Sequence, residues 1–207
     1  MRNLILIIIE SYLLGSIPFG YLLVRLIHGE DVRTSGSGNI GATNVSRKSP
    51  TLGAITLLLD AAKGTAAVAI AYFLSGKAGS GIMPYRSMAL AAFFAILGHV
   101  CPVWLRFRGG KGVATALGAF ALIAPFALLT VLVIFVVVLL IFRYVSLASI
   151  LSVSLFPVVV FAMHSYGRTP LVLAFIAAAA LLIVARHYEN IRRLLAGTER
   201  RFGEKPA

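Results

Sequence analysis

The sequence predicts an all-α, polytopic membrane protein with seven transmembrane helices, the N-terminus outside and the C-terminus in the cytoplasm. Of its 207 residues, 59% are hydrophobic and only 13% are charged, whereas a soluble domain carries about 45–50% apolar and about 25% charged residues. Long apolar stretches recur along the chain, and the 19 lysines and arginines are unevenly distributed between the segments that join them. We therefore expect one integral-membrane domain over residues 1–207.

Each predicted span follows from an apolar stretch, since a bilayer-crossing helix needs about 20 largely apolar residues. The stretches lie at 4–27, 52–74, 87–105, 112–123, 125–142, 146–164 and 169–186. The first is too long for a cleaved signal sequence, carries Glu10 and is broken late by Gly15, Pro18 and Gly20. We expect it to be a retained, broken span.

Residues 112–142 decide between six and seven spans because they contain no acidic or basic side chain. As a single helix they would run about 46 Å, which exceeds the roughly 30 Å hydrocarbon core. Pro125, near their centre, can end one helix and begin another. Seven spans place fourteen of the 19 cations inside and four outside, whereas six place seven inside and eleven outside. Because inner loops are rich in Lys and Arg, seven spans are favoured.

Several titratable groups within the spans have open roles. Asp60 and Lys63, three residues apart, are expected to pair, either as a structural tie beneath a site or as part of it. His99, near the end of the third span, fits a hydrogen-bonded structural residue as well as a ligand of a substrate. We assign no role to Glu10.

Three unusual polar segments share the cytoplasmic face on this topology, at residues 35–47, 98–115 and 186–193. The first is rich in Gly, Ser and Asn and ends at Arg47, so backbone N–H groups and a guanidinium could bind one anion. The second places Lys111 among glycines at a helix start, where free N–H groups and the helix dipole favour an anion. The third puts His187 and Asn190 on one helical face. Anchoring to anionic lipid is the expectation for Arg192, Arg193, Arg200 and Arg201.

The chain lacks several familiar catalytic patterns. It contains only two aspartates, which argues against two-metal phosphotransfer. No histidine is followed five positions later by Asp, so the H-x4-D acyltransferase pattern is absent. There is also no G-x-S-x-G elbow, which argues against a serine nucleophile. Residues 36–41 satisfy G-x-G-x-x-G, but no strand precedes them, so they do not predict a dinucleotide-binding site. The glycines around Lys111 do not form a P-loop, because Gly112 stands where a P-loop needs Ser or Thr. What remains is a set of anion-binding donors, which can catalyse by holding reactants together and stabilising negative charge.

Three ordered motifs of the chain resemble those of the acyl-phosphate:glycerol-3-phosphate acyltransferase family (PlsY) of bacterial phospholipid synthesis. They are Ser37-Gly38-Asn39-Ile40-Gly41-Ala42-Thr43-Asn44, then Gly98-His99…Pro102 with Gly109-Gly110-Lys111-Gly112-Val113-Ala114-Thr115, and Arg186-His187…Glu189-Asn190. The resemblance covers nearly the whole chain. It implies a seven-helix enzyme that transfers a fatty acyl group from acyl phosphate to the 1-hydroxyl of sn-glycerol 3-phosphate. The products would be lysophosphatidic acid and inorganic phosphate.

The same resemblance implies catalytic roles for Ser37, Arg47, Lys111, His187 and Asn190. It implies substrate-binding roles for Gly36, Gly38, Asn39, Thr43, Asn44, His99, Gly109, Gly110, Gly112, Ser146 and Ser149. It implies no metal and no cofactor, with a phosphate oxygen accepting the hydroxyl proton. His187 is expected to orient a phosphate or a neighbouring side chain rather than to act as a general base.

For location, we expect the bacterial cytoplasmic (inner) membrane, with the active site at the cytoplasmic face. The expected partners are membrane lipid, glycerol 3-phosphate and acyl phosphate, with a functional link to the enzyme that makes acyl phosphate. We expect a monomer and no nucleic-acid partner. An organophosphate or anion transporter and a non-catalytic lipid-binding scaffold are the alternatives. Polar segments crowded on one face disfavour the first, and the glycines disfavour the second.

Overall fold

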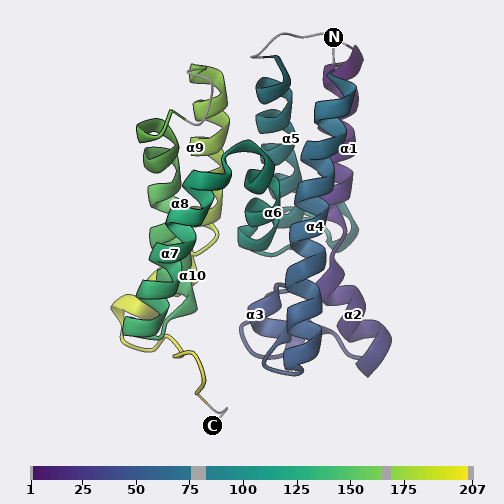
Figure 1. The fold of residues 1–207 in the computed structure, drawn as a ribbon. Helices are drawn as coiled ribbons and strands as arrows, with labels where there is room; N and C mark the ends of the chain where they lie inside the picture. Colours follow the sequence, from purple (N-terminus) through teal and green to yellow (C-terminus); the bar gives the residue numbers. More distant parts are fainter. Residues whose placement is uncertain (1, 76–82, 165–168, 205–207) are drawn as a thin grey trace.

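The computed structural model describes residues 2–75, 83–164 and 169–204, and all regular secondary structure in these ranges is helical. The elements are α1 (Arg2–Ser16), α2 (Phe19–His28), η1 (Val32–Thr34), α3 (Ala42–Val45), α4 (Pro50–Leu74), α5 (Met83–Val100), η2 (Val103–Leu105), α6 (Val113–Ile123), α7 (Pro125–Phe142), α8 (Val145–Ala162), α9 (Pro170–Ala185) and α10 (Tyr188–Leu195). They form an elongated bundle in which the start of α1 and the whole of α10 lie at opposite ends (Figure 1).

The breaks between helices follow signals in the sequence. α1 and α2 are separated at Pro18, which cannot donate the backbone hydrogen bond that a continuous helix requires. Pro125 is the first residue of α7 and directly follows the end of α6 at Ala124. The predicted division of residues 112–142 into two helices is therefore confirmed. α9 and α10 meet at a bend of 54°.

Glycines allow two helix pairs to pack backbone against backbone. A Cβ atom at Gly15 or Gly98 would lie 2.0 or 2.2 Å from a carbonyl oxygen across the α1–α5 contact. At Gly64 or Gly118 it would lie 2.1 or 1.9 Å from a carbonyl oxygen across the α4–α6 contact. Small residues permit such close approach between membrane helices. One group thus contains α1, α4, α5 and α6, while α9 packs between α5 and α8 and α7 packs on α8 (Figure 1).

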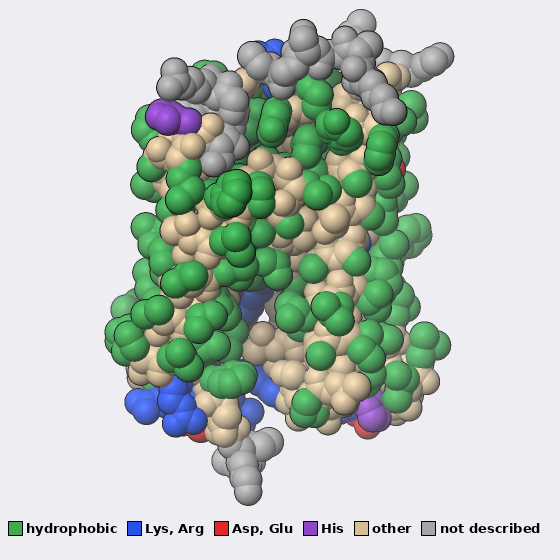
Figure 2. All heavy atoms as spheres, viewed as in Figure 1, with side chains coloured by type: hydrophobic (Ala, Val, Ile, Leu, Met, Phe, Trp, Pro, Cys, Tyr) green, Lys and Arg blue, Asp and Glu red, His purple; other side chains and the backbone are tan. Residues whose placement is uncertain are grey.

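The length and composition of the helices are those of an integral membrane protein with several spans. Among the described residues, five helices can cross a membrane, or six when the bent α9–α10 pair is counted as one span. α6 is shorter, because its 11 residues reach only about 16 Å, roughly half of the hydrocarbon core. Hydrophobic side chains cover the sides of the bundle (Figure 2). A helix lies at each of the seven predicted stretches.

The two ends of the bundle differ in charge. Basic side chains gather at the end that holds α2, α3 and α10, where a hollow opens between the two groups of helices (Figure 2). The first polar segment lies between α2 and α4, the second joins α5 to α6, and the third contains α10. This end therefore holds the candidate site.

Candidate active site

A direct hydrogen bond joins two of the three polar segments. Lys111 follows α5, Asn190 lies in α10, and Lys111 Nζ donates to Asn190 Oδ1 at 2.5 Å. Arg47, from the first segment, lies within electrostatic reach of Arg193 in α10 and of Glu199 shortly after it. The structure thus brings one predicted residue from each segment to one place.

Glu199 accepts hydrogen bonds from three side chains of this cluster, although the sequence did not predict a role for it. Its Oε1 accepts hydrogen bonds from Asn190 Nδ2 and from Ser146 Oγ, both at 2.6 Å. Its Oε2 accepts one from Arg193 Nε at 2.7 Å. Burial raises the pKa of Glu199, but these three donors outweigh burial and the pKa is lowered overall. Glu199 is therefore an anion that gathers the cluster and is a poor proton acceptor.

Asn44 organises the first polar segment from the inside. It is 4% exposed, and its Nδ2 lies 3.1, 3.1 and 2.9 Å from the backbone oxygens of Val32, Ser35 and Asn39. Its Oδ1 accepts a hydrogen bond from Ser37 N at 2.8 Å. One amide side chain thereby closes the loop and orients the backbone at Ser37.

The other predicted binding residues of this segment also act on the backbone. Gly36 has a φ of 62°, and a Cβ atom there would lie 2.2 Å from Asn44 Oδ1, so the site requires glycine. Gly38 also has a positive φ, of 67°. The Asn39 side chain accepts the backbone N–H two residues later at 2.9 Å, whereas Thr43 is exposed. Contact of these residues with a substrate stays a prediction.

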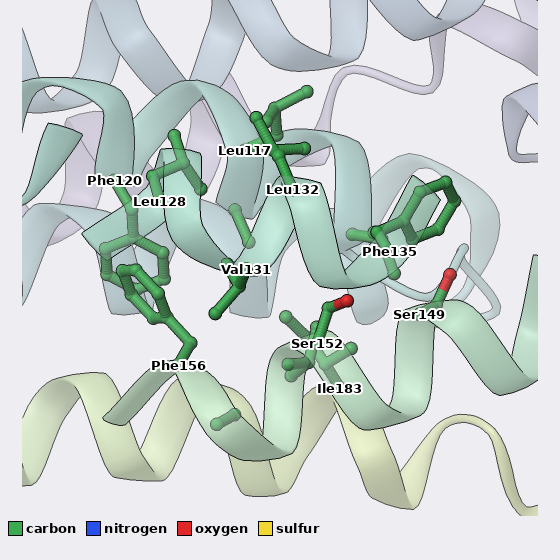
Figure 3. Close-up of a pocket in the computed structure, with 14 residues that line it drawn as sticks. Leu117, Phe120, Leu128, Val131, Leu132, Phe135, Ser149, Ser152, Phe156 and Ile183 are labelled. Atoms are coloured by element: carbon green, nitrogen blue, oxygen red, sulfur yellow. The ribbon is translucent and has the colours of Figure 1, made fainter. Parts of the chain in front are cut away.

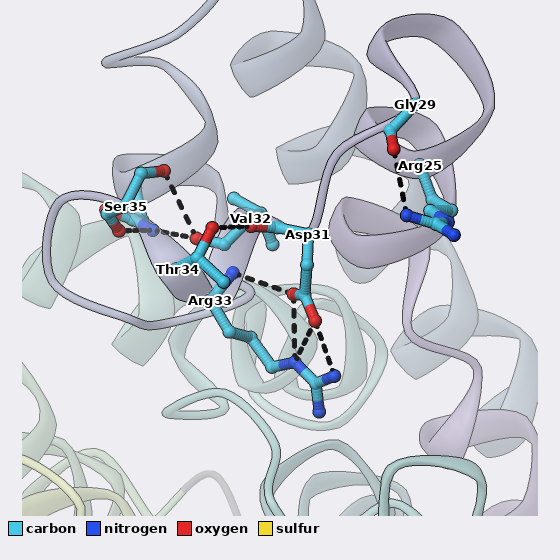
Figure 4. A network of polar contacts seen from close by, with 8 residues as sticks. Arg25, Gly29, Asp31, Val32, Arg33, Thr34 and Ser35 are labelled. Atoms are coloured by element: carbon cyan, nitrogen blue, oxygen red, sulfur yellow. Dashed lines mark hydrogen bonds and ion pairs between the residues drawn. The ribbon is translucent and has the colours of Figure 1, made fainter.

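Two arginines near this segment are held by local partners. Arg33 Nη2 lies 2.6 Å from Asp31 Oδ2, and Arg33 N donates to Asp31 Oδ1 at 2.9 Å (Figure 4). Hydrogen bonding by Arg33 lowers the pKa of Asp31. Arg25 Nη1 donates to Gly29 O at 2.8 Å. Arg47 Nη1 donates to Asn44 Oδ1 at 3.5 Å and also lies within electrostatic reach of Glu199.

The cations of the site are crowded. Burial lowers the pKa of Lys111 to about 8, so the amine is still mostly protonated at neutral pH. Partial desolvation, together with the positive charges of Arg200 and Arg193, lowers the pKa of Arg47, which nevertheless stays charged because a guanidinium does not deprotonate in proteins. Such perturbed groups in one hollow are characteristic of functional sites. A bound anion would relieve their mutual repulsion.

His187 lies at the start of α10 and is 2% exposed. Its Nδ1 lies 2.8 Å from Ile183 O, and since a carbonyl oxygen only accepts, we assign the ring proton to Nδ1. Burial and the charge of Lys111 lower the pKa of His187 to about 4. The imidazole is therefore neutral at pH 7, and its Nε2 is a hydrogen-bond acceptor.

The glycines beside Lys111 rest directly on His99. Gly110 N donates to His99 O at 3.0 Å. A Cβ atom would lie 2.1 Å from His99 Nε2 if placed at Gly110 and 2.2 Å from His99 O if placed at Gly109. Gly112 has a φ of 88° at the start of α6. The structure thus places His99, 4% exposed, beneath the loop that carries Lys111.

An apolar cavity adjoins the polar cluster. It has a volume of about 70 Å³ and lies between α6, α7, α8 and α9. Ser149 and Ser152 border it on α8, and Phe120 and Phe156 lie toward the other end (Figure 3), with ring centroids 4.8 Å apart. The other lining residues are Val113, Ala116, Leu117, Leu128, Val131, Leu132, Phe135, Val153, Ala180 and Ile183.

The cavity and the polar cluster are joined along α8. Ser146, one turn before Ser149, belongs to the Glu199 cluster, while the hydroxyl of Ser149 donates to Val145 O at 2.8 Å. The arrangement therefore offers a cationic, hydrogen-bonding site at one end and an apolar space at the other. Such a site suits a molecule with an anionic head and a hydrocarbon tail.

Comparisons with known proteins identify close relatives. A family model described as Glycerol-3-phosphate acyltransferase matches residues 5–197. A glycerol-3-phosphate acyltransferase of Geotalea daltonii is 47% identical over 203 residues, covering 98% of this chain and 99% of that protein. One of Syntrophotalea carbinolica is 42% identical with the same coverage.

Two solved structures have a similar fold. The glycerol 3-phosphate form of PlsY (YgiH), an integral membrane glycerol 3-phosphate acyltransferase, matches with a TM-score of 0.87 and 38% identity, covering 97% of this chain and 96% of that one. Its lysophosphatidic acid form matches with a TM-score of 0.83 and 36% identity, covering 97% and 95%.

Proposed function

This chain belongs to the glycerol-3-phosphate acyltransferase family, and on that basis we propose that it uses acyl phosphate to acylate the 1-hydroxyl of sn-glycerol 3-phosphate. The products are lysophosphatidic acid and inorganic phosphate, in the first acylation step of bacterial phospholipid synthesis. The observation that carries the proposal is the junction of the Lys111–Asn190 cluster with the apolar cavity at Ser149. The PlsY structures in glycerol 3-phosphate and lysophosphatidic acid forms support it.

The positive charges of the site reduce the repulsion between the two negatively charged substrates. Each substrate carries a phosphate, and two such groups repel each other when their reacting atoms approach to about 3 Å. Lys111 and Arg47 supply positive charge, and Asn190 and the backbone of the first polar segment supply further donors. Holding both anions together is the main contribution of the protein.

The cavity binds the acyl chain of the donor. The acyl chain lies among the apolar side chains of α6 to α9, with its phosphate toward Ser149 and Ser146 on α8. Because α7 is largely exposed on its outer side, we propose that the chain arrives sideways from the bilayer.

The acyl transfer requires no protein nucleophile. The 1-hydroxyl oxygen attacks the acyl carbonyl carbon, the bond from that carbon to the phosphate oxygen breaks, and the leaving phosphate takes the hydroxyl proton. Backbone N–H groups near Ser37 and the charge of Lys111 stabilise the oxyanion of the tetrahedral intermediate. His187, neutral at pH 7, orients a phosphate or the Lys111 side chain. This scheme requires neither a metal nor a cofactor.

We further propose seven spans in the bacterial cytoplasmic (inner) membrane, with the N-terminus outside and the active site and C-terminus in the cytoplasm. The opposite positions of the α1 start and α10 (Figure 1) and the cationic end near α10 (Figure 2) support this orientation. A reporter fused after Ala207 should read as cytoplasmic, and a periplasmic reading would contradict it. The enzyme is proposed to act as a monomer that depends on the enzyme making acyl phosphate and binds no nucleic acid.

The reaction can be tested with purified protein, palmitoyl phosphate and glycerol 3-phosphate. We expect glycerol-3-phosphate-dependent release of inorganic phosphate and formation of palmitoylated lysophosphatidic acid in equal amounts. Palmitoyl-CoA offered as donor should give no product. Phosphate release that is independent of glycerol 3-phosphate, or uptake of labelled glycerol 3-phosphate into sealed vesicles without acylation, would contradict the proposal.

A further inference from the structure

A buried ion pair lies below the candidate site and is not used by the proposed reaction. On α4, Lys63 Nζ lies 2.8 Å from Asp60 Oδ1, and the two side chains are 2% and 3% exposed. The predicted pairing of Asp60 with Lys63 is therefore confirmed. Charged groups at this depth are costly and tend to be retained for a role in function, so the contacts that each partner makes indicate that role.

The Asp60 side of the pair reaches the loop that carries Lys111. His99 Nδ1, on α5, lies 3.6 Å from Asp60 Oδ1. The two atoms are too far apart for a hydrogen bond, but the nearby carboxylate favours the proton on Nδ1. The other edge of the ring faces Gly110, where a Cβ atom would lie 2.1 Å from Nε2. Gly109 N and Gly110 N in turn donate to Val100 O and His99 O at 3.1 and 3.0 Å. The loop thus rests on an imidazole whose opposite edge faces the Asp60 carboxylate.

The Lys63 side of the pair reaches the segment that carries Arg47. Lys63 Nζ donates to Ile17 O at 2.7 Å, at the break between α1 and α2, and lies 5.7 Å from the ring centroid of Phe19 at the start of α2. α2 packs closely on the first polar segment, since a Cβ atom at Gly20 would lie 2.0 Å from Ile40 O. The direction of α2, and with it the place of the Arg47 segment, is therefore tied to Lys63.

We propose that Asp60, Lys63 and His99 form a positioning assembly that sets the Lys111 loop and the Arg47 segment relative to each other. The three residues act through the two loops, one on each side of a single ion pair, so His99 serves here as a positioning residue and not as a ligand of a substrate. The proposal rests on the proposed function, because the spacing of the two cations matters for a site that must hold two phosphates together.

The main test replaces both charges, by Asp60→Asn with Lys63→Met, because removing one partner alone would leave an uncompensated buried charge. We expect a fall of at least tenfold in kcat/KM, with KM raised for both glycerol 3-phosphate and palmitoyl phosphate. Thr56→Val is the matched control, since Thr56 is fully buried on the same helix and its hydroxyl donates to Leu52 O of that helix. The substitution keeps the methyl group that faces Gly20. It should stay within twofold of the wild type.

A second readout does not depend on activity. Amide hydrogen exchange of the peptide containing residues 106–115 should be faster in the double variant than in Thr56→Val, because Gly109 N–H and Gly110 N–H lose their fixed support. Unchanged exchange, or kcat/KM within twofold of the wild type per folded molecule, would overturn the proposal. Because the exchange measurement needs no substrate, it still judges the assembly if the wild-type protein has no acyltransferase activity.

If the double variant does not fold, a size-complementation cycle decides the same question. Gly110→Ala should reduce kcat/KM at least tenfold, because the new Cβ meets the His99 ring. In a His99→Ala background the ring is gone, and adding Gly110→Ala should lower kcat/KM by a much smaller factor than the same substitution does in the wild type. Full additivity of the two substitutions would overturn the contact on which the assembly depends.

Discussion

Deprotonation of Lys111 should limit the enzyme at alkaline pH. Burial lowers the pKa of its amine to about 8, so the charged form that attracts phosphate dominates below that pH and is lost above it. At pH 9, one unit above the pKa, only about one-tenth of free enzyme carries the charge. Because kcat/KM reports the free enzyme, we expect kcat/KM for glycerol 3-phosphate to be roughly tenfold lower at pH 9 than on its plateau near pH 7.

The assay would measure initial rates of glycerol-3-phosphate-dependent phosphate release from palmitoyl phosphate between pH 6 and 10, with the spontaneous hydrolysis subtracted. Full recovery on return to pH 7 would show that the protein stays folded. Lys111→Arg is the matched variant: its guanidinium stays charged over this range, so its residual kcat/KM should lose the alkaline decline. A flat profile to pH 9.5 in the wild type, or the same decline in Lys111→Arg, would refute the assignment.

Further substitutions test the other parts of the site. Arg47→Ala and Lys111→Ala should each remove about 2–4 kcal/mol of transition-state stabilisation, measured from kcat/KM, whereas Arg200→Ala should stay close to the wild type; near-normal turnover in either of the first two would remove that residue from the site. Phe156→Ala should open the end of the cavity and raise the relative rate with longer acyl phosphates, and an unchanged chain-length profile would count against the cavity as the acyl site. Gly118→Ala should lower the melting temperature in detergent, because its Cβ would lie 1.9 Å from a carbonyl oxygen of α4; an unchanged melting temperature would contradict that packing.

The helices could be read from the sequence because lipid imposes a simple rule on composition and length. Pro125 marked the division of residues 112–142, and Pro18 marked the break in the first span. The short α6 was predicted as the stretch 112–123, but its close packing against α4 through Gly64 and Gly118 was visible only in the structure. Those glycines look like ordinary small residues when the chain is considered alone.

Parts of the site were predictable where residue type restricts the chemistry. Lys111 among glycines and Asn190 beside His187 pointed to an anion site, and the structure joins Lys111 to Asn190. Glu199 gave no comparable signal, since it is one of three acids in a basic tail and its partner Ser146 lies 53 residues away in the chain. Arg193, grouped by charge with lipid-anchoring arginines, is instead bonded to Glu199. The pair of Ser146 with Glu199, 53 residues apart, has no local pattern that sequence reasoning could use.

The loop closed by Asn44 depends on the difference between an amide and a carboxylate. Hydrolysis of that amide to aspartate would leave the acceptor to Ser37 N intact, yet it would place a negative charge against three backbone oxygens that now receive hydrogen bonds. Spontaneous deamidation of this one buried residue would therefore be a chemical ageing lesion, which opens the segment carrying Arg47 while the helical bundle in the membrane stays intact.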